Sequence, residues 1–519
     1  MVFCLYHFMP KIAATFELAL PPRDLRISAY RWLYSALRSA ILEGRLHPGA
    51  RLPATRDLAT QYRLSRGTIV NSIEQLKSEG YVQARTGSGT YVSNTLPDEL
   101  LQVRSNAKPA LPPREQQQQE QVGSRAQKFS AYAKRVHLFP NFAPHPTRAF
   151  RSNLPALDLF PTTLWAQVAA RRLRKVSTNF LMGCDPLGYL PLRQAVAGYL
   201  STSRGVNCTA DQVAIVSGAQ EAFDLVARLF LNPGDRVCME NPGYTGATTV
   251  FQSLGAKLSH VPLDEEGMKL RAATLRNARL VYVTPGHQFP LGITMSLARR
   301  LQLLESARKS GALILEDDYD SEFRYSGRPV PALQGLDRHG HVLFTGSFSK
   351  VLFPSLRLGY LVLPTDFADR VSATLSITRR HAPLMEQAVL CDFITAGHFG
   401  RHLRRMRQIY AERLNVLLHS ARQNLTGLLE ISGIEAGLQT VGWLQRGINA
   451  ESAAAAAAKR NVEVTPLSMY SHGDVASTGL QLGFAAIDAK EIRRGVQDLA
   501  LALEQTMKAT NRGVSKRSL

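Results

Sequence analysis

A polar, low-complexity stretch divides this chain of 519 residues into two parts with different residue patterns. Residues 96–145 include NAKPALPPREQQQQEQVGSRAQKFS, which is rich in Pro, Gln, Ser and charge and has almost no large apolar side chain. Such a stretch cannot bury enough apolar surface to offset the conformational entropy that folding costs. We therefore predict a flexible linker over residues 96–145, with an independently folded domain on each side.

Residues 23–95, on the N-terminal side of the linker, are basic and helix-patterned. They contain 11 Lys and Arg against 5 Asp and Glu, and the whole chain carries a formal charge of +21. Such an excess attracts polyanions, of which nucleic acid is the first candidate. Apolar side chains recur at helical spacing in AYRWLYSALRSAILEG, which Gly44 ends, and Pro53 precedes a second helix, TRDLATQYR.

A third helix, RGTIVNSIEQLKSEG, follows a capping residue, Ser65. The short turn around Leu64 joins it to the second helix, as in a helix-turn-helix motif. In that motif the third helix enters the DNA major groove N-terminus first and would present Arg66 and Thr68. The following YVQARTGSGTYVS predicts a two-stranded wing whose glycines let the backbone approach a phosphate. From pattern alone, the alternative is a basic three-helix bundle that binds a protein.

This segment closely resembles the winged helix of GntR-family transcription regulators. The matching pieces are the PG turn, LPATRDLA, LSRGTI and EGYVQARTGSGTYV. The resemblance implies that Arg56 and Arg66 touch DNA, and Arg66 is the best candidate for reading a base edge, with guanine as the partner. The predicted DNA-binding residues are Arg45, Thr55, Arg56, Ser65, Arg66, Thr68, Arg85 and Gly89.

Residues 146–505, on the other side of the linker, alternate short β-rich runs with helical stretches. The runs are VAIVSG, RVCMEN, LVYVTP, ALILEDD, HVLFTGS and GYLVLP. This alternation predicts an α/β domain with a mostly parallel sheet. Polar residues follow the ends of these runs, where open α/β sheets bind ligands. Residues 506–519 are predicted to form a disordered tail.

One strand end carries a lysine among small hydroxyl residues. Lys350 follows the buried-looking run HVLFTGS, and partial burial would lower its pKa and free its amine to attack a carbonyl. Ser347, Ser349 and Arg357 are phosphate ligands by residue type. An aldehyde that also carries a phosphate satisfies both features, and pyridoxal phosphate is such a molecule.

Three other strand ends fit the same cofactor. The turn Ser217-Gly218-Ala219-Gln220 opens a helix whose backbone N–H groups can bind phosphate. Asp317 could keep a pyridine nitrogen protonated, and Tyr244 could stack on the ring. Each residue also has an ordinary reading as a surface lysine, acidic loop, plain turn or core tyrosine, so only their joint occurrence favours the cofactor.

Residues 146–505 also resemble a fold-type I aminotransferase domain, a pyridoxal phosphate-dependent fold. The strings DPLGYLPLRQAVAGYL, PGHQFPLGITM, EDDYDSEFRY and SFSKVLFPSLRLGY are similar to the MocR subfamily of GntR regulators, in which a winged helix is fused to such a domain. The resemblance implies that Lys350 forms the Schiff base with the cofactor and that Tyr319 contacts the ring's phenolic oxygen. It implies these cofactor-binding residues: Lys350, Asp317, Tyr319, Tyr244, Ser217, Gly218, Ala219, Gln220, Ser347, Ser349 and Arg357.

The sequence departs from the aminotransferase pattern at the substrate side. Phe289 stands where an asparagine usually bonds the ring oxygen, so His287 or Gln288 would have to supply that bond. Gln481 replaces the arginine that clamps a substrate carboxylate, and Gly246 supplies no cation either. The ligand is therefore expected to be the cofactor vitamer, an amine without a carboxylate, or an amino acid held by another arginine, such as Arg379 or Arg380.

Together these features predict a homodimeric transcription regulator that binds double-stranded operator DNA and a small-molecule effector. It would be cytoplasmic, and associated with the nucleoid when bound to DNA. The five cysteines lie far apart without CxxC spacing, and no apolar stretch could span a membrane, so neither a metal nor a membrane is expected. The alternatives are an active aminotransferase with an accessory DNA-binding domain, and a DNA-binding protein whose second domain holds no cofactor.

Overall fold

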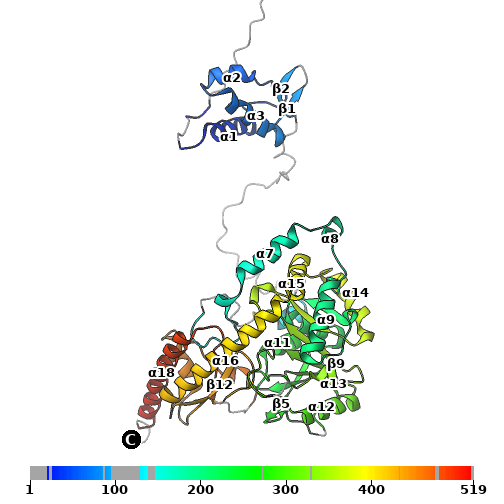
Figure 1. The fold of residues 1–519 in the computed structure, drawn as a ribbon, viewed down its shortest axis with the longest axis vertical. Coiled ribbons are helices and arrows are strands. Elements are labelled where there is room, and N and C mark those ends of the chain that lie inside the picture. Colours follow the sequence, from blue (N-terminus) through cyan, green and yellow to red (C-terminus); the bar gives the residue numbers. More distant parts are fainter. Residues whose placement is uncertain are drawn as a thin grey trace, which may run out of the picture. The chain divides into compact units, whose positions relative to one another are not determined.

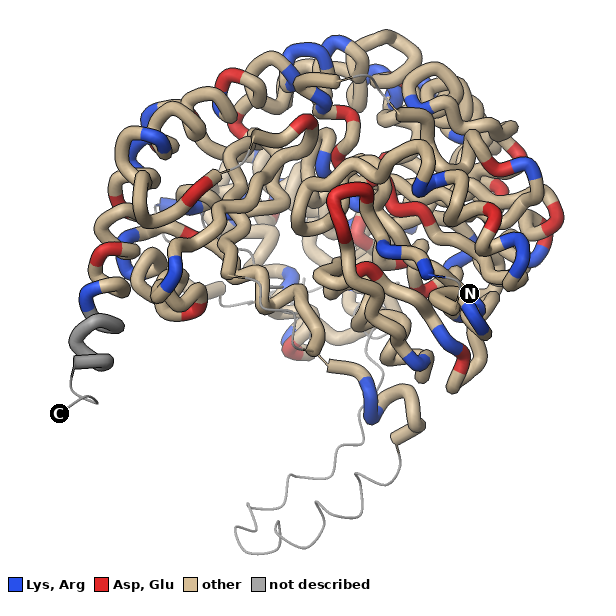
Figure 2. The backbone as a smooth tube through the Cα atoms, turned by 90° about the horizontal axis from the view of Figure 1, so that it is seen from below, with Lys and Arg blue, Asp and Glu red and all other residues tan. Residues whose placement is uncertain are grey.

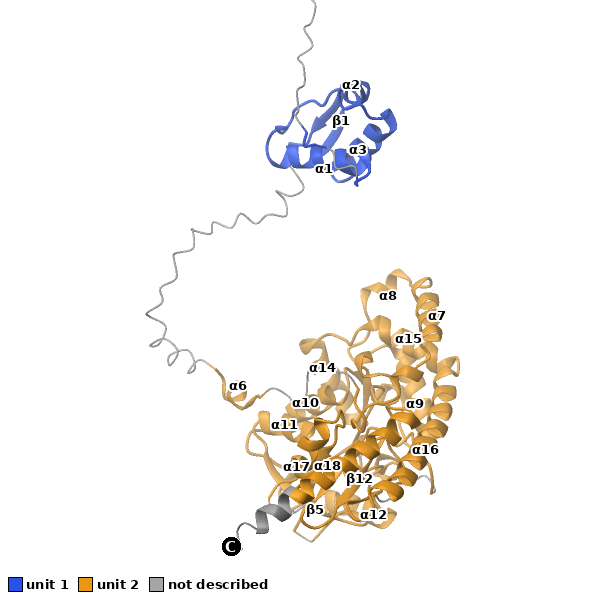
Figure 3. Ribbon diagram, turned by 90° about the vertical axis from the view of Figure 1, so that its left-hand side faces the viewer, with its two compact units in different colours: residues 1–121 blue, residues 122–519 orange. Residues whose placement is uncertain are grey.

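The computed structural model describes residues 20–22, 26–85, 88–94, 129–137, 147–271, 273–327, 330–431, 433–473 and 478–515. The chain forms two compact units, residues 1–121 and residues 122–519 (Figure 3). Each unit has its own buried apolar core, so each is described by itself.

The first unit is a helical bundle with a two-stranded wing (Figure 1). Its elements are α1 (Ala29–Leu42), α2 (Thr55–Gln61), α3 (Arg66–Ser78), β1 (Val82–Arg85) and β2 (Gly89–Val92). The apolar faces of the three helices meet in one core that includes Leu37, Leu58 and Ile69, and Val92 of the wing closes it. This arrangement confirms the predicted winged helix-turn-helix.

Serine caps set the starts of two of these helices. The Ser28 hydroxyl accepts the N–H of Arg31 at the start of α1, and the Ser65 hydroxyl accepts the N–H of Thr68 at the start of α3, at 3.1 Å. A cap of this kind satisfies an N–H group that the helix itself leaves unpaired. The predicted start of the third helix is therefore correct to the residue.

The second unit is built on a mixed sheet of eight strands in the order β3-β10-β9-β8-β7-β4-β5-β6. Strands β9, β8, β7, β4 and β5 run parallel, while β10 runs antiparallel to both β3 and β9. Their bounds are β3 (Val213–Val216), β4 (Arg236–Asn241), β5 (Lys257–Asp264), β6 (Gly267–Met268), β7 (Ala278–Val283), β8 (Leu313–Asp318), β9 (Val342–Ser347) and β10 (Gly359–Val362).

Helices cover both faces of this sheet, so its strands are buried on both sides. Val213 and Ile215 belong to one apolar cluster, and the alternating Ala214 and Val216 belong to another. Continuous apolar runs are expected for strands that are covered on both faces. The helices of the unit are α7 (Thr162–Leu173), α8 (Thr178–Met182), α9 (Leu190–Arg204), α10 (Ala219–Phe230), α11 (Thr245–Ser253), α12 (Leu297–Ser310), α13 (Leu333–Leu336), α14 (Ala368–Thr378), α15 (Leu384–Thr395) and α16 (His398–Asn424).

A second, antiparallel sheet of four strands follows in the chain, in the order β11-β12-β14-β13. Its strands are β11 (Leu429–Ile431), β12 (Gln439–Leu444), β13 (Thr465–Pro466) and β14 (Gly479–Gly483). Helices α17 (Ala450–Ala458) and α18 (Ala489–Ser515) pack with α16 beside this sheet. We call this four-stranded sheet, α17, α18 and the segments that connect them the small subdomain.

Two segments differ from the predicted boundaries. A short helix, α6 (Ala131–Arg135), lies inside the predicted linker and contacts α11, where Arg135 Nε donates to the carbonyl of Ser253 at 2.9 Å. Helix α18 continues to Ser515, and Thr506 within it is buried, although disorder was predicted from residue 506. Within the predicted linker and tail, residues 96–128, 138–145 and 516–519 lie outside the described residues.

Charge is distributed over the second unit rather than segregated. Lys and Arg are interspersed with Asp and Glu along its helices and loops (Figure 2). In the described part of the chain, no helix is both long and apolar enough to cross a membrane. Within the same residues, no group of three His, Cys, Asp or Glu side chains is arranged to hold a metal ion.

Candidate functional site

A cavity of about 400 Å³ lies at the carboxyl ends of strands β3, β4, β7, β8 and β9. It collects polar residues from segments that are far apart in the sequence, as expected for the ligand site of an open α/β sheet. Its lining residues are Arg151, Ser152, Asn153, Ala219, Gln220, Tyr244, Thr245, Tyr282, Thr284, Phe289, Asp317, Tyr319, Ser347, Ser349, Lys350, Pro354, Arg357, Glu463, Thr465, Met469 and Tyr470.

Lys350 projects into this cavity shortly after the end of β9. Its Nζ donates a hydrogen bond to the carbonyl of Asn153 at 2.8 Å. Burial lowers the pKa of Lys350 to about 8, although the carboxylates of Asp320 and Asp317 pull that pKa upward. With this pKa the amine is half unprotonated near pH 8, and the unprotonated form is the one that attacks a carbonyl.

Asp317 lies near the end of β8 with one oxygen bonded and one without a partner. Its Oδ2 accepts the hydroxyl of Tyr282 at 2.7 Å, whereas its buried Oδ1 has no hydrogen-bond partner. The pKa of Asp317 is raised to about 7, mainly by burial; the nearby carboxylates of Asp318 and Asp320 also raise it, while Tyr282 and Lys350 lower it. An unpaired buried carboxylate oxygen is costly, so this site is suited to a ligand that brings an N–H donor.

The other end of the cavity is suited to an anion. Gly218 has φ 98° and precedes α10, whose free N–H groups begin at Ala219. Arg357 lies directly above this turn, since a Cβ on Gly218 would be 3.5 Å from its Nη1. The Ser349 hydroxyl is buried without a partner. A helix N-terminus, an arginine and a hydroxyl together form a site for a phosphate group.

Ser217, the first residue of this turn, does not line the cavity. Its hydroxyl accepts from Arg379 Nη1 at 3.2 Å, and its N–H donates to Glu221 at 2.5 Å. Arg379 also contacts Glu221 and donates to the carbonyl of Ile215. Neither Arg379 nor the exposed Arg380 lies among the cavity residues, so the structure places both away from a ligand in this cavity.

Aromatic rings form the side walls. Tyr244 lies edge-on to Phe289, with ring centroids 5.3 Å apart, and its hydroxyl accepts from Gln220 Nε2 at 3.3 Å. Tyr319 Oη is 3.1 Å from Nδ1 of His287, which also contacts Asp320 at 2.9 Å. His287 therefore acts on the cavity only through Tyr319.

Neither candidate for the missing asparagine reaches the cavity. His287 and Gln288 are buried behind the wall that Phe289 forms. The Gln288 amide nitrogen donates to the carbonyls of Pro242 and Phe289 at 3.0 and 2.5 Å, and its oxygen accepts the N–H of Leu291. The structure thus gives no support to direct cofactor contact by His287 or Gln288. Tyr319 lines the cavity where the usual asparagine would bond the ring oxygen.

The substrate side of the cavity has no arginine clamp on β14. Gln481 is fully buried, and its Oε1 accepts the hydroxyl of Tyr470 at 2.9 Å. Gly246 could not carry a longer side chain in this arrangement, because a Cβ there would be 2.3 Å from Gln220 Nε2 and 2.5 Å from the ring of Tyr244. The packing around Gln481 and Gly246 therefore accommodates these two residues closely.

Sequence reasoning missed the loop that closes the cavity from the N-terminal side. Arg151, Ser152 and Asn153 line it, and the carbonyl of Phe150 accepts the N–H of Gly483 on β14 at 2.8 Å. The carboxyl ends of the strands pointed to most of the other residues, but this loop follows no strand and only tertiary contacts bring it there. The phenol of Tyr282 was missed because it lies inside a strand that reads as apolar core.

The first unit presents its predicted DNA-binding side chains to solvent. Arg56, Arg66 and Arg85 are exposed, on α2, α3 and β1 respectively. The Arg85 guanidinium lies over the ring of Tyr91, 4.9 Å from its centroid. Arg51 was not predicted, yet it lies beside Gly89, where a Cβ would be 3.0 Å from its Nε.

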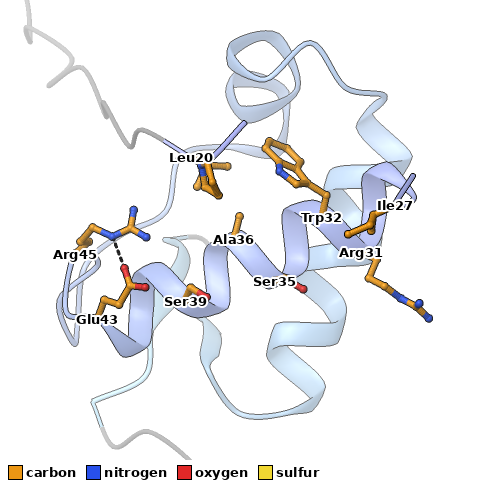
Figure 4. Close-up of a pocket in the computed structure, with 10 residues that line it drawn as sticks. Leu20, Ile27, Arg31, Trp32, Ser35, Ala36, Ser39, Glu43 and Arg45 are labelled. Atoms are coloured by element: carbon orange, nitrogen blue, oxygen red, sulfur yellow. Dashed lines mark hydrogen bonds and ion pairs between the residues drawn. The ribbon is translucent and has the colours of Figure 1, made fainter. Parts of the chain in front are cut away.

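Arg45 lies at the rim of a hollow beside α1 (Figure 4). Its Nε donates to Glu43 at 2.8 Å, which holds it along the end of that helix. Trp32 lines the same hollow, and its indole N–H is buried without a partner. A phosphate contact by Arg45 would therefore have to compete with Glu43.

Comparison with known proteins gives the same division of the chain. Residues 29–92 match the bacterial regulatory proteins of the gntR family, and residues 152–499 match aminotransferase class I and II. The chain is 39% identical over 487 residues to the probable rhizopine catabolism regulatory protein MocR of Rhizobium meliloti, covering 93% of this chain and 96% of that protein. The chain belongs to the MocR subfamily of GntR-family transcription regulators.

Other relatives of this MocR-type regulator include both regulators and enzymes. It is 31% identical to the pyridoxine biosynthesis transcriptional regulator PdxR of Corynebacterium glutamicum, over 92% of this chain and 97% of that protein. LysN, an α-aminoadipate aminotransferase from Thermus thermophilus, was solved with N-(5'-phosphopyridoxyl)-L-leucine. It matches with a TM-score of 0.68 and 29% identity, over 74% of this chain and 99% of LysN. This MocR-type regulator is thus a transcription regulator with a DNA-binding domain of the GntR type and an aminotransferase-like domain.

The residues of the MocR-type cavity fit pyridoxal phosphate. The cofactor needs an amine for its aldehyde, a carboxylate for its pyridine nitrogen and an anion site for its phosphate. Lys350, Asp317 and the Gly218 turn with Arg357 lie in one cavity and meet these needs. The buried orphan atoms Asp317 Oδ1 and Ser349 Oγ would gain partners from the pyridine N–H and the phosphate.

Proposed function

We propose that this protein binds pyridoxal phosphate through Lys350 and uses the loaded cavity to sense a small amine, which changes how its winged helices bind an operator. One observation carries the proposal most directly. A low-pKa amine, a buried carboxylate oxygen without a partner and an anion-binding turn converge on one cavity, in a chain that also carries a DNA-binding unit.

When bound, pyridoxal phosphate supplies an aldehyde carbon that primary amines attack. The chain's own groups prepare for this chemistry. Asn153 holds the Lys350 Nζ at 2.8 Å, and burial lowers the pKa of that amine to about 8, so more of it is unprotonated at neutral pH than in an ordinary lysine. Tyr282 fixes one oxygen of Asp317 and leaves the other to face a pyridine N–H. Tyr244 and Phe289 line the sides of the cavity with aromatic surface.

We propose that the protein acts in the cytoplasm as a homodimer, associated with the nucleoid when bound to DNA. Two winged helices in one dimer would bind two half-sites with a gain from effective concentration. An effector can shift the domain arrangement only if its affinity differs between the two arrangements. The long connection between the units would let the winged helices adjust to a change in the second unit.

The cofactor is tested by visible absorbance and by peptide mass. Purified protein incubated with pyridoxal phosphate should gain a visible band, and borohydride reduction should leave a phosphopyridoxyl adduct on the peptide that contains Lys350. Lys350→Ala should lose both signals. Lys309→Ala, which removes an exposed lysine of α12, should keep them. A colourless wild-type protein, or an adduct only at other lysines, would leave a DNA-binding protein with an empty second domain.

A working aminotransferase is the second candidate, because LysN is an enzyme of the same fold and the amine and carboxylate of such a site are both present here. Gln481 argues against it, since a neutral amide cannot replace an ion pair with a substrate carboxylate. We expect negligible complete transamination in an assay with a keto-acid acceptor and a panel of amino donors. Sustained turnover would reverse this ranking.

A further inference from the structure

The cations that line the cavity, among the described residues, each already lie against another group. Lys350 holds the Asn153 carbonyl, and Arg357 lies above the Gly218 turn, where the phosphate would bind. Arg151 lies with its Nε 3.6 Å from the carboxylate of Glu463, which lines the same cavity. A ligand carboxylate would therefore have to break the Arg151–Glu463 pair or remain unpaired beside Glu463.

The small subdomain instead presents neutral and acceptor groups to the cavity. The Tyr470 hydroxyl donates its one proton to Gln481 Oε1, at 2.9 Å. Burial raises the pKa of Tyr470 to about 12, so this proton stays in place at physiological pH. A phenol has one donor and two acceptor lone pairs. The Ser152 and Thr465 hydroxyls lie against the oxygen of Tyr470, so the three hydroxyls form one group that a ligand hydroxyl can join.

The surrounding groups continue this pattern. Ser152 and Thr465 place hydroxyls in the same wall, and Glu463 adds a carboxylate. Ser152 also precedes Asn153, whose carbonyl holds the Lys350 Nζ, so the hydroxyl-lined wall begins beside the reactive amine. Hydroxyls both donate and accept, whereas a carboxylate only accepts. A ligand hydroxyl can donate to these oxygens, whereas a ligand carboxylate has no proton to donate and would lie beside the carboxylate of Glu463.

Gln481 lies in a tightly packed part of β14. The side chain has no exposed surface, and its Nε2 is buried without a partner. Gly483, on the same face of β14, leaves no room for a larger neighbour, since a Cβ there would be 2.1 Å from the Arg151 carbonyl.

We propose that the effector is a primary amine that carries a hydroxyl group near its amine and no carboxylate. Its amine would meet the cofactor beside Lys350, and its hydroxyl would bond Tyr470 and the hydroxyls next to it. This inference rests on the proposed binding of pyridoxal phosphate and narrows the class of ligand that the loaded cavity takes.

Three matched probes test this preference on the full-length, cofactor-loaded protein: L-alaninol, L-alanine and isopropylamine. They share one carbon skeleton and carry a hydroxymethyl group, a carboxylate and a methyl group at the same position. The readouts are the change in visible absorbance and the shift in Tm at each probe concentration. L-Alaninol should half-saturate both readouts at a concentration about tenfold lower than isopropylamine needs, because one good hydrogen bond is worth about a factor of ten in affinity. L-Alanine should bind most weakly of the three.

Two variants and one control test whether the cavity wall around Tyr470 causes the preference for a hydroxyl. Tyr470→Phe should bring L-alaninol to the level of isopropylamine without changing the isopropylamine curve. Gln481→Arg should make L-alanine the preferred probe. If Gln481→Arg does not fold, Tyr470→Phe still tests the inference. Gln445→Arg, which adds an arginine at an exposed position of the small subdomain, should behave as wild type.

The three ways of failing are distinguishable. If the wild type gains no visible band with pyridoxal phosphate, the proposed function itself fails. If the band forms but L-alanine binds as well as or better than L-alaninol, the inference is wrong and the cofactor site stands. The inference is also overturned if no probe changes the loaded protein while pyridoxal phosphate alone changes DNA binding, because the cofactor would then be the effector.

Discussion

Asp317 is the residue at which stability and ligand binding oppose each other. Its carboxylate is buried with one unpartnered oxygen, so the ionised form bears a cost that a pyridine N–H donor would remove. Burial raises its pKa to about 7, against about 4 for an ordinary aspartate. Because the folded pKa is the higher one, the cost is full above pH 7 and disappears as pH falls toward 4.

Asp317→Asn should therefore stabilise the cofactor-free protein at pH 8, by roughly 1–3 kcal/mol, with a smaller gain at pH 5. The same change should weaken pyridoxal phosphate binding at least about tenfold and alter the visible band, because the pyridine nitrogen loses its anionic partner. Thermal unfolding at the two pH values and a cofactor titration measure both effects. A variant that is less stable at pH 8 and binds the cofactor normally would contradict this account.

Arg66 should determine DNA specificity, because it begins α3 and is exposed. Arg66→Ala should weaken cognate binding by about 1–3 kcal/mol while changing binding to random DNA much less. Lys77→Ala, at the other end of the same helix, is the control and should affect the two DNAs equally and slightly. Fluorescence anisotropy with both DNAs at several salt concentrations separates the effects, and equal losses for Arg66→Ala would assign it to phosphate only.

Among the residues that line the cavity, the sequence predicted those at the ends of strands. It missed those that lie in a loop or within a core strand. Lys350 and Asp317 were predicted because polar residues at the end of a buried strand point to the ligand edge of the sheet, and both line the cavity. Asn153, which holds the lysine, was missed because its contact with Lys350 spans the sequence and leaves no local pattern. His287 was predicted at the ring, but a bond to Asp320 holds it behind Tyr319.

At the level of elements, caps and turns made the winged helix predictable. Ser65 caps the start of α3, and the wing pairs Arg85 with Gly89 where the sequence has glycines. The extra helix α6 was not predicted, because its five residues carry no apolar face and depend on contacts such as the bond from Arg135 to Ser253. Short helices form mainly through tertiary contacts, which no local pattern contains.

The Ser65 cap allows helix stability and DNA binding to be separated. Ser65→Ala should destabilise the first unit by about 1 kcal/mol, because the N–H of Thr68 loses its acceptor. Ser65→Asp should keep the cap and the stability but weaken DNA binding, since its charge would face phosphates. Ser65→Thr, the control, should retain both. Thermal unfolding and anisotropy measure the two properties, and normal DNA binding by Ser65→Asp would place this helix start away from the DNA.

For the whole molecule, the question is how two separate folding units can act as one regulator. Each has its own apolar core, and the described residues include no helix shared between them. Effector binding and DNA binding can therefore be coupled only if each ligand binds some arrangements of the two units more tightly than others. Among the described residues, no continuous apolar core transmits the change. Such coupling is reciprocal for binding free energies.

This reciprocity gives the last prediction. If L-alaninol changes the operator affinity of the cofactor-loaded protein by some factor, saturating operator must change the affinity for L-alaninol by the same factor, within the range of about 5- to 150-fold that is typical of such coupling. Titrating the amine by visible absorbance with and without operator, and the operator by anisotropy with and without amine, closes the cycle. Lys350→Ala should bind operator with an affinity that the amine no longer changes. An amine effect that persists in this variant would mean that the amine acts elsewhere than the cavity.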